Sequence, residues 1–162
     1  MKVTTQDSQR LFCTFRLEGQ LFGVDILDVK EVTTEMVCTR VAHSPEEVRG
    51  LVNIRGHIHL ALDLRCLLGM PPAPRTEHSR LILFKPIVGS AFGVIVDEIS
   101  EIHAVAAAQI EPFSLEQHEG LTAQLRRVDL IAFVGKLQEE LLVILNAHRF
   151  LRIMEANFVG ST

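Results

Sequence analysis

The stretch Arg10-Leu11-Phe12-Cys13-Thr14-Phe15, followed by Phe22-Gly23-Val24, has a second copy later in the chain. The copy reads Arg80-Leu81-Ile82-Leu83-Phe84 and then Phe92-Gly93-Val94, so each part recurs 70 residues further on. An apolar run, a short turn and a second run are typical of a β-hairpin. Self-similarity at a fixed offset indicates a duplicated supersecondary unit. The sequence therefore predicts two similar small units that present surfaces rather than one active site.

Outside the two hairpins, the chain consists of short strand-like runs separated by turns. This pattern predicts a mainly β fold of two units with about five strands each, together with short helices and a C-terminal helix. Neither unit can bury much core alone, so we expect the two to pack against each other and against that helix. A three-proline stretch separates the copies and is the expected linker. The signal Ser44-Pro45-Glu46-Glu47 predicts a helix start. The expected parts are a flexible N-terminal tail (1–9) and a single domain (10–158) with a first lobe (about 10–70), a linker (about 70–79), a second lobe (about 80–146) and a C-terminal helix (about 147–158).

The composition excludes several classes of function. The net charge is −4 and no block of Lys or Arg occurs, so we expect no nucleic-acid partner and no anionic membrane patch. No apolar run reaches the roughly 18 to 20 residues of a bilayer helix, and the N-terminus lacks the apolar stretch of a signal peptide. These features predict a cytoplasmic protein with no direct membrane insertion. Cys13, Cys38 and Cys66 form no C-x-x-C pair, which predicts reduced thiols rather than disulfides or a zinc site.

The best candidate for metal binding is the group His57, His59 and Asp63, which would also serve the less favoured alternative function, a small metal-dependent enzyme. Alternate strand residues face the same way, and imidazoles are good ligands for transition metals. Asp63, however, lies about 13 Å beyond His59 along an ideal strand at roughly 3.3 Å per residue. The alternative is that this face of the strand is simply exposed to water. Since the chain also lacks a G-x-S-x-G elbow and a Gly-rich phosphate loop, we expect no metal, no cofactor and no enzyme activity.

Three polar residues lie where a core does not explain them. Asn53 and Arg55 interrupt an apolar strand, and Glu31 follows the first hairpin. An exposed arginine is a frequent binding hot spot, because its planar fork makes several directional hydrogen bonds while its stem packs on apolar neighbours. Alternatively, Arg55 pairs internally with Asp63 or Glu31 and stabilises the lobe. The two roles are compatible, and the sequence leaves both open.

The chain resembles the CheW family, the adaptor proteins of bacterial chemosensory arrays. The resemblance covers residues 10 to about 155, and the segment from Gly50 to Gly69 is its most specific part. It is carried by Ile26-Leu27-Asp28-Val29-Lys30-Glu31-Val32, by Val48-Arg49-Gly50-Leu51-Val52-Asn53-Ile54-Arg55-Gly56, by Asp63-Leu64-Arg65 with Leu68-Gly69, and by Phe92-Gly93-Val94-Ile95-Val96-Asp97-Glu98-Ile99.

This resemblance implies a fold of two SH3-like five-stranded β-barrels and a function without catalysis. Family members couple the cytoplasmic tips of methyl-accepting chemoreceptors to the regulatory domain of a histidine autokinase, beside membrane-bound receptor arrays. A groove between the lobes takes the receptor, and the second lobe takes the kinase domain. Mapped onto this chain, the receptor-binding positions are Val29, Glu31, Gly50 and Arg55, to which we add Asn53. The resemblance assigns no kinase-binding residues here.

The chain departs from the family pattern at four positions. Leu60 stands where a proline is usual, His57 and His59 replace more typical residues, and Asn146 stands where an acidic residue is common. These departures suggest, as the alternative function, a divergent paralogue that scaffolds a chemosensory-like pathway with a non-flagellar output, such as surface sensing, pili or a second messenger.

Overall fold

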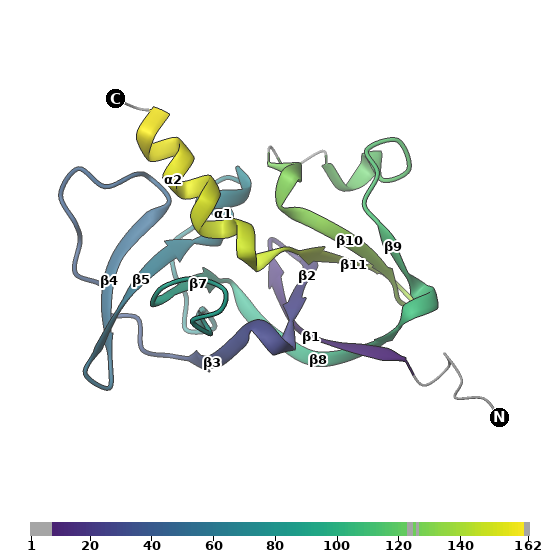
Figure 1. Ribbon diagram of the computed structural model, residues 1–162, viewed down its shortest axis with the longest axis horizontal. Helices are drawn as coiled ribbons and strands as arrows, with labels where there is room; N and C mark the ends of the chain where they lie inside the picture. Colours follow the sequence, from purple (N-terminus) through teal and green to yellow (C-terminus); the bar gives the residue numbers. More distant parts are fainter. Residues whose placement is uncertain (1–7, 123–124, 126, 161–162) are drawn as a thin grey trace.

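The structure is a computed structural model that describes residues 8–122, 125 and 127–160 (Figure 1). Its strands form two sheets, and the C-terminal helix packs across one side. The strands are β1 (Gln9–Leu17), β2 (Gln20–Asp25), β3 (Val29–Thr33), β4 (Val48–Ile54), β5 (His57–Asp63), β6 (Arg80–Phe84), β7 (Phe92–Val96), β8 (Glu98–Ala106), β9 (Ile110–Pro112), β10 (Ile131–Lys136) and β11 (Leu141–Leu145). The helices are α1 (Leu64–Leu68) and α2 (Phe150–Gly160), with short 3-10 turns η2 (Ile26–Asp28), η3 (Ala107–Gln109), η4 (Glu119–Thr122), η5 (Val128–Leu130) and η6 (Ala147–Arg149).

The two sheets do not follow the two halves of the chain. Sheet A has the strand order β8-β1-β2-β11-β10-β9, and sheet B has the order β3-β6-β7-β5-β4. The first hairpin, β1–β2, therefore lies among strands of the second half, and the second hairpin, β6–β7, lies among strands of the first half. The expected division at residues 70–79 separates the two copies in the sequence, whereas the sheets exchange their hairpins.

The exchange is symmetric, because equivalent residues make equivalent contacts. Phe22 and Gly23 pair in parallel with Val143 and Ile144 of β11. The residues 70 positions later, Phe92 and Gly93, pair in parallel with Leu60 and Ala61 of β5. A Cβ on Gly93 would lie 2.5 Å from the backbone oxygen of Ile82, so a side chain there would collide with the neighbouring strand. The duplication is thus visible in the tertiary structure.

The mainly β fold with a C-terminal helix is confirmed, and two details differ from expectation. Sheet A has six strands rather than five, because the short β9 pairs with β10 through Val134 and Glu111. Residues 44–47 form a turn instead of a helix start: the Val48 N–H donates to the Pro45 oxygen at 3.0 Å and the chain enters β4 directly. At the N-terminus, β1 begins at Gln9, and residues 1–7 of the expected tail lie outside the described residues.

The largest apolar cluster contains residues of both sheets together with α1 and the start of α2. Strand β6 shows the arrangement: Ile82 and Phe84 belong to this shared core, while Leu81 and Leu83 belong to a smaller cluster on the other face of sheet B. Phe150 of α2 packs edge-to-face on Phe84, with 5.8 Å between the ring centroids. Because most of the buried apolar surface is shared, each sheet depends on the other for its stability.

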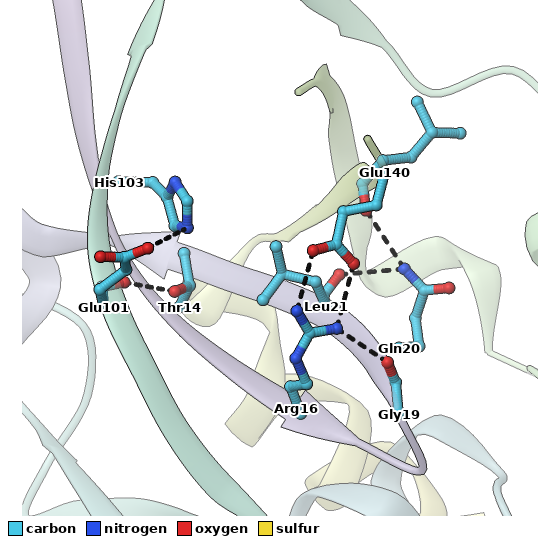
Figure 2. Close-up of polar contacts among 9 residues, drawn as sticks. Thr14, Arg16, Gly19, Gln20, Leu21, Glu101, His103 and Glu140 are labelled. Atoms are coloured by element: carbon cyan, nitrogen blue, oxygen red, sulfur yellow. Dashed lines mark hydrogen bonds and ion pairs between the residues drawn. The ribbon is translucent and has the colours of Figure 1, made fainter. Parts of the chain in front are cut away.

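Polar contacts join the turn of the first hairpin to the turn between β10 and β11 (Figure 2). The Arg16 guanidinium makes two hydrogen bonds to the Glu140 carboxylate, at 3.0 and 2.8 Å, and donates to the Gly19 oxygen at 2.9 Å. Along the edge of β1 that pairs with β8, the Thr14 hydroxyl donates to the backbone oxygen of Glu101. The hydrogen bond from Arg16 lowers the pKa of Glu140 below its ordinary value. Both charged side chains are well exposed, so the pair contributes at most about 1 kcal/mol.

Candidate functional site

The β4–β5 turn carries Arg55 at the end of sheet B. Arg55 and Gly56 both have positive φ angles, 50° and 88°, as a two-residue type I′ hairpin turn requires. The Asn53 side-chain oxygen accepts a hydrogen bond from the Gly56 N–H at 2.8 Å. Asn53 therefore stabilises the turn that presents Arg55.

Arg55 donates a hydrogen bond to the carboxylate of Glu31 in β3. Of the two internal partners that the sequence left open, Glu31 is the one observed. The Arg55 side chain is nevertheless 70% exposed, against 26% for Glu31. The pairing orients the guanidinium without burying it, so Arg55 remains available to a partner.

The other two expected receptor-binding positions, Val29 and Gly50, do not face solvent. They shape the edge of sheet B. Val29 is buried in the shared core and pairs with Phe84 of β6. Gly50 has a φ of 144°, and a Cβ there would lie 2.4 Å from the Thr39 backbone oxygen. Thr39 and Leu51 exchange two backbone hydrogen bonds of 2.8 Å. Gly50 thus allows Thr39 to pair with β4. Thr39 belongs to residues 34–47, which we call the strap.

Exposed apolar side chains occur in β1, η2, β3 and β8, and sequence reasoning missed them. Leu11 in β1 and Ile102 in β8 come from the edge strand of sheet A and its neighbour, while Leu27 in η2 and Val32 in β3 come from the segment that enters sheet B. Figure 1 shows β1, β8 and β3 along one side of the molecule, and η2 contacts β1. Leu27 is 70% exposed and Ile102 is 61% exposed. We call these four exposed apolar residues the edge surface, a candidate for a protein contact.

The three residues considered for metal binding are separated in the structure. The His59 ring nitrogen Nδ1 lies 3.1 Å from the backbone oxygen of His57, which is itself exposed. Asp63 pairs with Arg49 at 2.9 Å and accepts a hydrogen bond from the Cys66 N–H at the start of α1. Among the described residues, no group of three or more potential ligands gathers anywhere.

The alternative, that this face of β5 is simply exposed to water, holds for His57 but is wrong for the rest of the face. His59, Ala61 and Asp63 are buried, whereas Ile58 on the opposite face is 54% exposed. The reason is that Ala61 packs into the smaller apolar cluster of sheet B with Val52. Exposure falls along β5 from His57 to Asp63 on both faces, so alternation does not separate a solvent-exposed face from a buried one.

Two of the family departures have a visible structural role. The Leu60 N–H donates to the Ala91 oxygen at 2.9 Å, a bond that the usual proline cannot make because it lacks the N–H. The Asn146 side-chain oxygen accepts from the His148 N–H at 3.0 Å and so caps η6. An acidic residue could cap this turn in the same way.

Arg65 in α1 and Asp97, between β7 and β8, form an ion pair that sequence reasoning did not assign. Arg65 donates to both carboxylate oxygens of Asp97, at 2.9 and 2.5 Å, and Asp97 also accepts from the Glu18 N–H at 2.8 Å. Burial raises the pKa of Asp97, but the hydrogen bonds from Arg65 and Glu18 and the charge of Arg65 together bring it below its ordinary value. This cluster connects the first hairpin turn of sheet A to α1, the helix that follows β5 of sheet B.

The comparisons with known proteins agree with this architecture. The family model of the CheW-like domain matches residues 11–155 of this chain. The chain belongs to the CheW-like family. A probable chemotaxis protein CheW from Rhizobium etli is 34% identical over 104 residues, which cover 64% of this chain and 66% of that protein. A chemotaxis protein CheW from Klebsiella aerogenes is 26% identical over 150 residues, covering 93% of this chain and 86% of its own length.

A solved structure extends the CheW-like match to three dimensions. The crystal structure of the scaffolding protein TtCheW from Thermoanaerobacter tengcongensis aligns with a TM-score of 0.76 at 26% identity and covers 88% of this chain and 92% of that one. The expected two-lobed CheW-like fold is therefore confirmed. In the part of the chain that the structure describes, no helix has the length and apolar character to cross a membrane.

Proposed function

We propose that this CheW-family chain is a non-catalytic adaptor that couples the cytoplasmic tips of chemoreceptors to the regulatory domain of a histidine autokinase. Such an adaptor acts in the cytoplasm at membrane-bound receptor arrays. The observation that carries the proposal is the exposed Arg55, oriented by Glu31 at one edge of sheet B. An arginine held in this way beside apolar surface is typical of a binding hot spot.

The proposed receptor-binding surface consists of the turn with Asn53 and Arg55, the partner residue Glu31, and the adjoining edge surface. Val29 and Gly50 belong to it as supports, since Val29 anchors β3 in the core and Gly50 admits the strap. An α-helical receptor tip could place apolar side chains on Leu27 and Ile102 and a polar side chain on Arg55. We assign no residues to the kinase contact.

The mechanism is simultaneous binding. By holding receptor and kinase at once, the adaptor turns their encounter into an effectively intramolecular one. A receptor state that binds the adaptor differently then shifts the population of active kinase. The same two contacts serve a flagellar pathway and a pathway that controls surface sensing, pili or a second messenger, so the proposal covers either output.

Isothermal titration calorimetry tests the proposal, and it needs no tryptophan or tyrosine, both of which the chain lacks. The intact chain is titrated separately with the regulatory domain of a chemosensory kinase and with a receptor-tip fragment, both from the same organism. Saturable binding of both, with one kinase domain per chain, is the expected result. Absence of binding to every such kinase and receptor of that organism overturns it.

A further inference from the structure

A cavity of about 390 Å³ lies beside sheet B, between the strap, the start of β4, α1 and the segment that joins α1 to β6. Its volume falls within the range of roughly 300 to 1,000 Å³ that is usual for small-molecule sites. Three arginines from three separate segments line it: Arg40 from the strap, Arg49 from β4 and Arg75 from the segment after α1. The cavity therefore brings three guanidinium groups together.

Among the described residues, a carboxylate partner is found for only one of these arginines. Arg49 pairs with Asp63 at 2.9 Å. Arg75 donates to the backbone oxygen of Met36, which holds the side chain but leaves its charge uncompensated. Arg40 makes no hydrogen bond or ion pair with any described residue. With Glu46 as the remaining carboxylate, the lining carries three positive and two negative charges.

The remaining wall is apolar or weakly polar, formed by Val48, Ile95, Pro72 and the thiols of Cys38 and Cys66. We infer that the cavity binds a small organic oxyanion, a carboxylate or a phosphate monoester. Arg40 and Arg75 supply planar forks that match the oxygens of either group. The apolar wall takes the carbon body of the ligand, and Glu46 accepts a hydrogen bond from a hydroxyl or amino group that the ligand carries.

Binding of an oxyanion in this cavity would also affect the strap. Arg40 follows Thr39, whose backbone pairs with Leu51 next to Gly50. An oxyanion held by Arg40 would therefore restrain the segment on which the conformation at Gly50 depends. The inference of the site itself stands on the cavity and its charges and is independent of the adaptor proposal.

The two lining thiols give a readout confined to the cavity. The intact protein is treated with iodoacetamide at about pH 9, because thiolates are the reactive form, and alkylation of each cysteine is followed by mass spectrometry. The probes are glycerol 3-phosphate and glycerate, with sodium chloride at equal ionic strength as reference. An oxyanion shields the thiols, and it also offsets the charges of Arg75 and Arg49, which favour the Cys38 thiolate. The expected result is saturable slowing of Cys38 and Cys66 by about threefold or more at millimolar probe, with Cys13 unchanged.

The variant Arg40→Gln removes one guanidinium that has no partner in the described part of the chain and should weaken the protection about tenfold. Arg152→Gln, at an exposed position on α2, is the matched control and should leave it unchanged. Protection by only one probe identifies phosphate or carboxylate as the preferred group, and protection by both supports a general oxyanion site. Slowing equal to that in sodium chloride, or equal in both variants, overturns the inference.

Discussion

Arg55, in the turn between β4 and β5, donates a hydrogen bond to Glu31 of β3 and so connects the two outermost strands of sheet B. Since β3 and β4 are separated by three strands in the sheet order, the sheet must curve for these residues to meet. The Thr39–Leu51 pairing connects the same two edges through the strap. Sheet B is thereby held in a closed, barrel-like form, with an exposed arginine at the point of closure.

Replacing Arg55 should separate binding from stability. Because the side chain is mostly exposed, Arg55→Ala should lower the free energy of unfolding by less than about 1 kcal/mol. Affinity for the receptor fragment should fall at least about tenfold, as expected for a hot-spot arginine. Urea unfolding and calorimetry measure the two quantities on the same preparation.

Arg152→Ala provides a control for removal of an exposed arginine elsewhere and should change neither quantity. The reversed pair, Glu31→Arg with Arg55→Glu, should keep the fold but fail to bind the receptor, since the guanidinium has moved. If Arg55→Ala instead loses its folded structure and its binding together, Arg55 is a structural residue only.

Gly50→Ala should be strongly destabilising. The new Cβ would meet the Thr39 oxygen and the residue would keep a φ that side chains disfavour, which together cost about 2 to 4 kcal/mol. Gly56→Ala is the matched comparison, since its φ is also positive but nothing lies within 4 Å of the added Cβ. It should cost only about 1 kcal/mol. Equal losses in thermal unfolding would show that the contact with the strap contributes nothing.

The hairpins could be predicted from the sequence, but their exchange could not. Leu11 to Leu17 and Leu21 to Val24 form a local pair, and turn length and alternation are sufficient to identify it. The partners of that hairpin, β8 and β11, lie far along the chain. Because the two copies have the same apolar pattern, either half could have accepted either hairpin, and only tertiary packing decides between them.

The candidate site, like the fold, could be predicted only in part from the sequence. Arg55 and Glu31 stood out as polar residues in apolar surroundings, but the sequence could not choose between Glu31 and Asp63 as partner, since that choice depends on the curvature of sheet B. Leu11 and Ile102 were missed because they sit in strands that look like core, and their exposure follows from the position of β8 at the edge of sheet A. The cavity arginines were missed because they lie far apart in the sequence.

The Arg65–Asp97 pair should make stability depend on acid pH. The pKa of Asp97 is lower in the folded protein than its ordinary value, so the pair stabilises the fold above the unfolded-state pKa and loses this effect as pH falls through the folded value. Asp97→Asn should therefore cost about 1 to 2 kcal/mol at neutral pH. The difference from the unmodified protein should shrink below about pH 4.

Chemical unfolding between pH 7 and pH 2.5 measures this difference. Glu98→Gln, at the neighbouring exposed position, removes a carboxylate without removing the pair and should follow the unmodified protein at every pH. A gap between Asp97→Asn and the unmodified protein that stays constant on acidification would contradict the role assigned to the ionised Asp97.

The thiols should react slowly in the folded protein. Burial raises the pKa of Cys13 to about 11, and burial together with the nearby carboxylates Glu46, Glu47 and Asp63 raises that of Cys66 to about 12. At pH 8 the thiolate fractions are then about one in a thousand and about one in ten thousand. The alkylation rate of Cys66 should rise about tenfold for each pH unit between pH 8 and pH 10. In guanidinium chloride, all three cysteines should react as fast as a free thiol, and a rate for Cys66 in the folded protein that levels off below pH 9 would show that its thiol ionises like an exposed one.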